Sequence, residues 1–210
     1  MGYNFKYLLI VFLFFSFISC ENSKNKYHKK FAVVSAKIEA SKAGYEILKM
    51  GGNAFDAMIA TDLALAVVYP NAGNLGGGGF MVYRLSDGDY GSLDFREKAP
   101  LAATKDMYLD ESGNVIKGLS REGALSVGVP GTVAGLFEVY DRFGSLPLDS
   151  LFKPALNLAM NGFSLTNKQA KTFNQNKKII LSNSNDIEIF NKDFKEGMIF
   201  SNPSLHSTLQ

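Results

Sequence analysis

The chain has 210 residues, of which 46% are hydrophobic and 20% charged, a composition typical of a globular protein with a sizeable core. Its formal net charge of +2 excludes a strongly basic field of the kind that holds nucleic acid, so we expect no nucleic-acid partner. Two histidines and one cysteine almost exclude a zinc site, which needs three or four such ligands, and we expect no metal.

The N-terminus carries the pattern of a bacterial lipoprotein signal. Lys6 precedes an apolar stretch that is too short for a comfortable membrane-spanning helix, which needs about 20 residues, but that fits the h-region of a secretory signal. The stretch ends in FISC, which resembles a lipobox, and Cys20 is the only cysteine of the chain. We therefore predict a signal peptide over residues 1–19, lipidation of Cys20, and a polar tether over residues 20–30.

The same signal also predicts where in the cell the protein is located. The protein is expected in the bacterial cell envelope, anchored to a membrane through its lipid and facing the periplasm or the exterior. Two other interpretations remain open, namely an ordinary signal peptide with an incidental cysteine and an uncleaved anchor.

The body of the chain, residues 31–210, begins with FAVVSA, residues 31–36, which predict a short strand. Ser35 can cap a helix that follows, and Gly51 and Gly52 end it. The apolar residues of this helix recur at helical spacing, and they are Ala40, Ala43, Ile47 and Leu48.

A second helix is predicted from Ala54 to about Val68. Asn53 can accept a hydrogen bond from the backbone near Asp56, an acid that suits the first turn of a helix, and Pro70 ends the helix. Its apolar face is wide, so we expect this helix to be largely buried.

Four consecutive glycines, residues 76–79, follow this helix and precede a predicted hairpin. The apolar runs FMVYRL and YGSLDF flank Asp87 and Gly88, and Asp-Gly between two such runs is a hairpin signal. A phosphate-binding loop has its glycines after a strand and before a helix, which is the opposite order. We therefore expect the glycines to allow close packing of a neighbouring element.

The second half of the chain contains further predicted elements. A polar loop follows the hairpin, with a turn at residues 112–114. The segment ALSVGVPG, residues 124–131, predicts a buried strand. Helices are predicted over residues 132–143 and about 151–160, whereas the helical pattern weakens from residue 166 onward. Strands flanked by helices favour a layered architecture of sheet and helix.

Three blocks in this order resemble the large-subunit portion of gamma-glutamyltranspeptidases, also called glutathione hydrolases: EILKMGGNAFDAMIATDLALAVVYPNAGNLGGGGFMVY, LDFREKAP, and GALSVGVPGTVAGLFEVYDRFGSLPL. The resemblance runs from about Phe31 to about Leu165, and residues 166–210 fit more loosely. It implies an α+β fold, the four-layer αββα sandwich of N-terminal-nucleophile hydrolases. Residues 31–210 would be the incomplete N-terminal part of the large subunit.

The activity that the resemblance implies is hydrolysis or transfer of the γ-glutamyl group of glutathione and other γ-glutamyl compounds. The precursor in this family cleaves itself, and a threonine becomes the N-terminus of a small subunit, whose free α-amine can activate the hydroxyl. The implied partners are therefore a γ-glutamyl substrate and the small subunit from the same precursor. No cofactor is implied.

The family's nucleophile lies in a Thr-Thr-His context, and this chain contains no Thr-Thr pair. We therefore expect no catalytic residue in this chain, and we expect the chain by itself to be an inactive fragment. Nothing around Ser182, Ser184 or Thr208 suggests an activated hydroxyl.

One substrate-binding residue carries over from the resemblance. The family uses the arginine of its DFRE motif to hold the α-carboxylate of the γ-glutamyl substrate, and that arginine is Arg96 here. A guanidinium suits this role because it donates two parallel hydrogen bonds to a carboxylate. The alternative is a surface arginine paired with Asp94 or Glu97.

Two other functions stay open at this stage. One is a related acylase or amidase of the same superfamily, which would share the three blocks and differ in its substrate. The other is a non-catalytic surface lipoprotein that binds an amino acid or a peptide.

Overall fold

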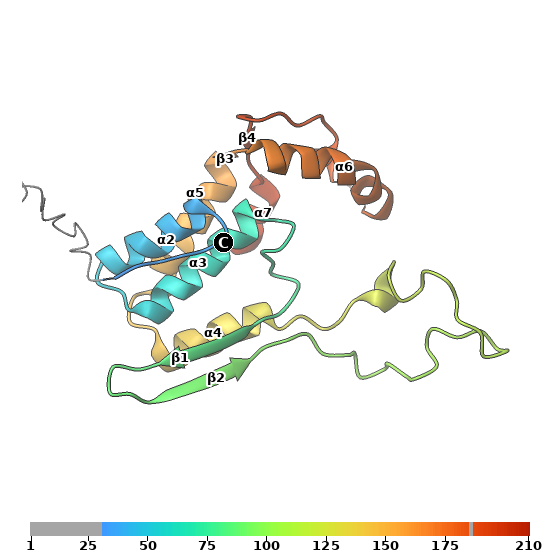
Figure 1. Ribbon diagram of the computed structural model, residues 1–210, viewed down its shortest axis with the longest axis horizontal. Helices are drawn as coiled ribbons and strands as arrows, with labels where there is room; N and C mark the ends of the chain where they lie inside the picture. Colours follow the sequence, from blue (N-terminus) through green and yellow to red (C-terminus); the bar gives the residue numbers. More distant parts are fainter. Residues whose placement is uncertain (1–30, 185–186) are drawn as a thin grey trace, which may run out of the picture. The chain divides into compact units, whose positions relative to one another are not determined.

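The computed structural model describes residues 31–184 and 187–210, so the predicted signal peptide, Cys20 and the tether lie outside the described residues. Val33–Gln210 form one unit of helices and short strands (Figure 1). Its α-helices are α2 (Ile38–Lys49), α3 (Ala54–Val68), α4 (Thr132–Phe143), α5 (Leu148–Asn161), α6 (Asn167–Asn183) and α7 (Pro203–Leu209). In this part of the chain no helix has the length and apolar character needed to cross a membrane.

Helix α3 is the centre of the core and has the predicted bounds and cap. The side-chain oxygen of Asn53 accepts hydrogen bonds from the backbone of Phe55 at 2.8 Å and of Asp56 at 3.0 Å. The Asp56 carboxylate accepts the backbone N–H of Asn53 at 2.9 Å, which completes a capping box. Because α3 packs against α2, α4 and α5, residues on all its sides are buried, as predicted.

Helices α2 and α3 approach each other closely at Gly44. A Cβ atom at this position would lie 2.8 Å from the backbone oxygen of Ala57 and would collide with the hydroxyl of Thr61. The predicted end of α2 is confirmed, because the backbone N–H of Gly52 donates to the carbonyl of Ile47 at 3.1 Å and Gly51 has a positive φ of 95°.

The predicted hairpin is also confirmed. Strands β1 (Phe80–Arg84) and β2 (Tyr90–Asp94) pair antiparallel, with Phe80 opposite Asp94 and Arg84 opposite Tyr90. Side chains alternate between exposed and half-buried along both strands. On the inner face the Tyr83 ring contacts Phe55 of α3 and Phe143 of α4, at centroid distances of 5.6 and 5.0 Å.

Helix α6 is a regular helix of 17 residues, although its apolar pattern in the sequence is weak. A capping box between Thr166 and Gln169 begins it, and the Gln169 side-chain amide donates to the carbonyl of Val68 at 2.9 Å. Phe173 packs within a cluster of aromatic rings from the last third of the chain. The other members of this cluster are Phe163, Phe190, Phe194 and Phe200.

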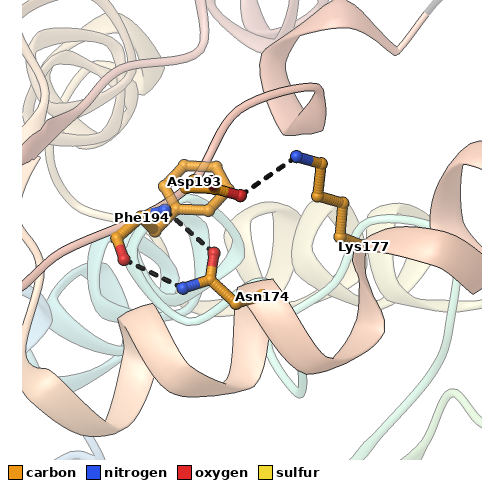
Figure 2. A network of polar contacts seen from close by, with 4 residues as sticks. All are labelled: Asn174, Lys177, Asp193 and Phe194. Carbon is orange, nitrogen blue, oxygen red and sulfur yellow. Dashed lines mark hydrogen bonds and ion pairs between the residues drawn. The ribbon is translucent and has the colours of Figure 1, made fainter.

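Two polar contacts join α6 to the segment that leads to strand β4 (Ile199–Phe200), which pairs with β3 (Phe163–Ser164). The amide of Asn174 donates to the Phe194 carbonyl at 2.9 Å and accepts the Phe194 N–H at 2.8 Å (Figure 2). Lys177 forms an ion pair with Asp193 at 3.2 Å.

Two predicted strands are wrong. Residues 31–36 alternate in exposure as a strand does, but no strand is assigned there within the described chain. Residues 124–131 form a 3-10 turn, η1 (Ala124–Ser126), followed by one bridge from Val129 to Lys98. The three alternating apolar side chains of this second segment are exposed rather than buried, and they are Leu125, Val127 and Val129.

The predicted cap of α2 is wrong as well. The helix begins after Lys37, which has no side-chain cap, and the Ser35 hydroxyl instead donates to the Lys37 carbonyl at 2.8 Å. Helix α5 begins three residues before the predicted start, directly after Pro147, whose extended backbone allows the following residue to enter a helix.

Candidate functional site

The chain changes its pairing partner directly after β2, where the predicted site residue lies. Phe95 extends the hairpin, because its N–H donates to the carbonyl of Gly79 at 3.1 Å. Three residues later Lys98 exchanges both backbone hydrogen bonds with Val129, at 3.1 and 2.8 Å. Residues 95–98 therefore lie between the glycine run on one side and the segment that leads into α4 on the other.

The glycine run is tied to the start of α4 as well. The carbonyl of Gly77 accepts the N–H groups of Gly131 and Thr132, at 2.8 and 3.0 Å. The side-chain oxygen of Asn74 accepts the Gly77 N–H at 2.8 Å and the hydroxyl of Thr132 at 2.7 Å. Thr132 is 2% exposed, so this junction is part of the protein interior.

Gly78 and Gly79 permit close packing of a neighbouring segment, which confirms the structural interpretation for these two glycines of the run. A Cβ atom on Gly79 would lie 2.6 Å from the ring of Phe95, and one on Gly78 would lie 2.7 Å from the Phe95 carbonyl oxygen. Gly76 differs from them, because a Cβ atom there would meet nothing within 4 Å.

A groove of about 330 Å³ opens where these segments meet. Its lining comes from the end of β2, the residues after it, and the start of α4: Leu93, Asp94, Phe95, Arg96, Lys98, Val129, Pro130, Gly131, Ala134, Gly135 and Glu138. Its volume lies at the low end of the range of ligand sites in proteins, roughly 300–1,000 Å³.

Arg96 lies in the lining of this groove with an exposed side chain. The carboxylate of Asp94 accepts the backbone N–H of Arg96 at 3.0 Å rather than its side chain. Within residues 31–184 and 187–210 the Arg96 guanidinium makes no ion pair or hydrogen bond, so the surface pairing with Asp94 or Glu97 is not formed. Its donors are available to a ligand.

The other charged groups of the lining favour an anionic ligand group at Arg96. Lys98 adds a second cation, and its ammonium has no ion-pair partner in the described part of the chain. Of the two acids, Glu138 is already paired with Arg142 on α4, and the Asp94 carboxylate accepts the backbone N–H of Arg96. A carboxylate fits this arrangement because a guanidinium can bind it with two parallel hydrogen bonds.

A larger cavity, of about 520 Å³, lies among α3, α4, α5 and α7. Its lining is mostly apolar, with Asp149, Thr208 and Gln210 as its polar residues. Because no cationic side chain lines it, this cavity has no group that would bind an anionic part of a substrate, and we assign the candidate site to the groove at Arg96.

The family model for gamma-glutamyltranspeptidase matches residues 40–210. The chain belongs to the gamma-glutamyltranspeptidase family. This membership confirms the resemblance that the three sequence blocks indicated.

Individual members of the gamma-glutamyltranspeptidase family agree with this assignment. A glutathione hydrolase proenzyme of Pseudomonas aeruginosa is 45% identical over 179 residues, which are 85% of this chain and 32% of that protein. One from Pseudomonas sp. strain A14 is 59% identical over 133 residues, which are 63% of this chain and 23% of that protein. This chain thus spans about a third or less of the length of these relatives.

A solved gamma-glutamyltranspeptidase structure has the same fold. The enzyme of Helicobacter pylori is 44% identical, with a TM-score of 0.83 over 88% of this chain and 54% of that one. The α+β fold of an N-terminal-nucleophile hydrolase is therefore confirmed for this part of the protein. The described residues themselves form two two-stranded sheets.

Ser182, Ser184 and Thr208 all lie in helices or at a helix end. Ser182 donates to the carbonyl of Ile179 at 3.1 Å, and Thr208 donates to that of Ser204 at 3.0 Å. Ser184 is the C-cap residue of α6. For Ser182 and Thr208 the hydroxyl proton is donated to a backbone carbonyl and not to a side-chain base.

Some residues of the groove had no role in the sequence-based prediction. Lys98 and Glu138 carry no local signal, because only the fold brings them to the groove beside Arg96. Gly131, the N-cap residue of α4, and Gly135, in its first turn, do carry one, because residues four positions apart lie on the same side of a helix. The two acids of α3, Asp56 and Asp62, do not line the groove.

Proposed function

We propose that this chain forms part of the large-subunit side of an enzyme that hydrolyses or transfers γ-glutamyl groups of glutathione and related compounds. In this proposal Arg96 binds the α-carboxylate of the γ-glutamyl group. The observation that carries the proposal is the guanidinium of Arg96, which lines a groove and has no protein partner among the described residues. Its support is the family membership and the relatives described above, which are glutathione hydrolase proenzymes.

The chemistry of the substrate fits this groove. A γ-glutamyl group has its α-carboxylate three carbons away from the carbonyl that reacts, so a carboxylate anchor can hold the substrate without touching the scissile bond. Lys98 raises the positive potential around Arg96. Anchoring restricts the orientation of the γ-carbonyl, and a restricted orientation lowers the entropic part of the barrier.

The remaining chemistry belongs, in this proposal, to a small subunit made from the same precursor. Its N-terminal threonine would attack the γ-carbonyl while its own α-amine takes the hydroxyl proton, and backbone N–H groups would stabilise the oxyanion. Water or an amino acid would then accept the γ-glutamyl group.

The test is the kinetics of Arg96→Lys in the full gene product that carries this chain, with a γ-glutamyl anilide as the donor. An ammonium cannot reproduce the two-pronged contact, and a lost hydrogen bond to a charged group costs roughly 1.5–3 kcal/mol. We therefore expect kcat/KM to fall about ten- to a hundredfold, while self-cleavage continues because it requires no bound substrate.

Arg84→Lys is the matched control, because Arg84 is exposed at the opposite end of the same hairpin. It should leave kcat/KM unchanged. An unchanged kcat/KM in Arg96→Lys would make Arg96 a surface residue, and a loss of self-cleavage would make it a structural one.

We also propose that the protein is a lipoprotein of the bacterial envelope. Cys20, preceded by a short apolar stretch and the residues FIS, is the sequence feature that supports this proposal. It lies outside the described residues, so its support is the sequence alone.

A further inference from the structure

We propose that Phe95 is a positioning residue, which sets the place of Arg96 because its ring and backbone are enclosed by glycines of two different segments. This inference rests on the proposed role of Arg96 in substrate binding. It assigns a role in substrate affinity to Gly78 and Gly79, beyond the packing already described.

The enclosure has two walls. On one side Gly79 faces the Phe95 ring edge, at 2.6 Å from an added Cβ atom to Cε2. On the other side Gly135 of α4 faces the same ring so closely that an added Cβ atom would collide with it. Because a Cβ atom essentially never lies within 3.0 Å of another heavy atom that is not bonded to it, neither wall has space for a side chain.

The backbone at Phe95 and Arg96 is enclosed in the same way. A Cβ atom on Gly78 would lie 2.7 Å from the Phe95 carbonyl oxygen and 2.8 Å from Cα of Arg96. One on Gly131 would collide with the Phe95 carbonyl oxygen. These neighbours are backbone atoms, so they cannot move aside by a change of rotamer.

Residues 93–96 connect the enclosed Phe95 to the groove, and the exposure of their side chains alternates. Leu93 and Phe95 are half-buried, whereas Asp94 and Arg96 are exposed, so successive side chains lie on opposite faces of the chain. Phe95, Gly131 and Gly135 line the same groove as Arg96, so the enclosure of Phe95 forms part of the wall beside the guanidinium. A shift of Phe95 would move Arg96 with it.

The first test compares Gly78→Ala with Gly76→Ala in the full gene product, with a γ-glutamyl anilide as the donor. A new methyl group at position 78 presses on the backbone of Arg96, whereas one at position 76 meets open space and that glycine has no positive φ. A displacement of about 1 Å can cost on the order of a hundredfold in an enzyme. We expect KM to rise about ten- to a hundredfold in Gly78→Ala and to stay unchanged in Gly76→Ala.

A double-mutant cycle separates positioning from general damage. If Gly78 acts through Arg96, Gly78→Ala should add less than about twofold to KM once Arg96→Lys is present. If the two KM effects multiply, or if Gly78→Ala alone leaves KM unchanged, the positioning role is overturned. If Arg96→Lys by itself has no effect, the proposed function fails instead, and the two failures are therefore distinguishable.

A milder pair keeps the inference testable if Gly78→Ala prevents self-cleavage. Gly79→Ala overlaps with the Cε2 and Cζ atoms of the Phe95 ring, which a leucine side chain lacks. We expect Gly79→Ala to raise KM and the combination with Phe95→Leu to bring KM back toward that of Phe95→Leu alone. A combination that is no better than Gly79→Ala would overturn the inference.

Discussion

The side chain of Asp56 receives both polar donors of Ser145, a residue 89 positions further along the chain. The Ser145 backbone N–H donates to one carboxylate oxygen at 3.0 Å, and its hydroxyl donates to the other. The buried capping acid of α3 thereby holds the turn between α4 and α5. Burial raises the pKa of Asp56, but hydrogen bonds from Ser145, Asn53 and Leu146 together outweigh burial and lower the pKa below its usual value.

This lowered pKa predicts a loss of stability in acid. The contribution of Asp56 is fully present above the pKa of an unfolded aspartate, about 3.9, and is lost as the pH falls through the lower folded pKa. Asp56→Asn should therefore cost roughly 1.5–3 kcal/mol at pH 7. Thermal unfolding should show the gap between the variant and the parent protein narrowing below about pH 4.

The control for this prediction is Asp149→Asn. Asp149 is also an acid in the first turn of a helix, but it is exposed. It should change stability by no more than about 0.3–1 kcal/mol at pH 7. Equal losses in the two variants would show that the contacts of Asp56 to Ser145 contribute little.

Gln169→Glu is expected to lower stability by weakening the contact between α6 and the end of α3. The Gln169 amide donates to the carbonyl of Val68, and a carboxylate of the same shape would replace that donor with a second acceptor. Leaving a buried carbonyl without its donor costs about 1–3 kcal/mol. Thermal unfolding should report this loss, whereas Gln175→Glu, an exposed change on the same helix, should fall within about 0.5 kcal/mol of the parent protein.

The two contacts in Figure 2 should differ in their contributions to stability. Asn174→Ala removes both hydrogen bonds to the Phe194 backbone, each worth about 0.5–1.5 kcal/mol. Lys177→Ala removes an ion pair whose carboxylate partner is 84% exposed, and exposed pairs contribute about 0–1 kcal/mol. We therefore expect a lower melting temperature for Asn174→Ala than for Lys177→Ala, and the opposite order would contradict this reasoning.

Cys20→Ser is expected to remove the lipid and release the protein from the membrane. A single acyl chain binds only marginally, so stable anchoring requires more than one chain. Metabolic labelling with a fatty-acid analogue should therefore label the parent protein and not the variant. Equal labelling of both proteins would rule out lipidation at this position.

Local signals predicted the elements that they fully determine. The Asn53–Asp56 capping box and the Asp87–Gly88 turn involve neighbouring residues. Helix α3 has the expected bounds, and each strand of the hairpin is one residue shorter than its apolar run. The box between Thr166 and Gln169 is equally local, and its Thr-x-x-Gln pattern could have identified the start of α6. The weak apolar pattern of that helix concealed it.

Strand predictions failed where pairing depends on distant residues. Leu125 and Val127 alternate as strand residues do, yet the Ser126 hydroxyl donates to the Gly123 carbonyl at 2.7 Å and the chain turns there. Only Val129 meets a pairing partner in the described chain, namely Lys98. Alternation indicates that a residue can occupy a strand, but it cannot show whether a neighbouring strand is present.

Of the candidate site, the sequence predicted one residue, Arg96, and did not predict the residues around it. Arg96 followed from the family motif, but periodicity alone would have left it as a surface arginine. Phe95 gave no signal of its own, because its enclosure requires Gly79 and Gly135, which are distant in the sequence and meet only in the fold.

The exchange of hydrogen bonds between Lys98 and Val129 closes the excursion of residues 99–128 at its base. The excursion has internal contacts of its own, among them the hydrogen bond from the Tyr108 hydroxyl to the Leu125 carbonyl at 2.8 Å. Doubling the length of a flexible loop costs only about 0.6 kcal/mol in closure entropy. Insertions and deletions between these two residues can therefore accumulate in evolution and reshape the surroundings of the groove while Arg96 keeps its place.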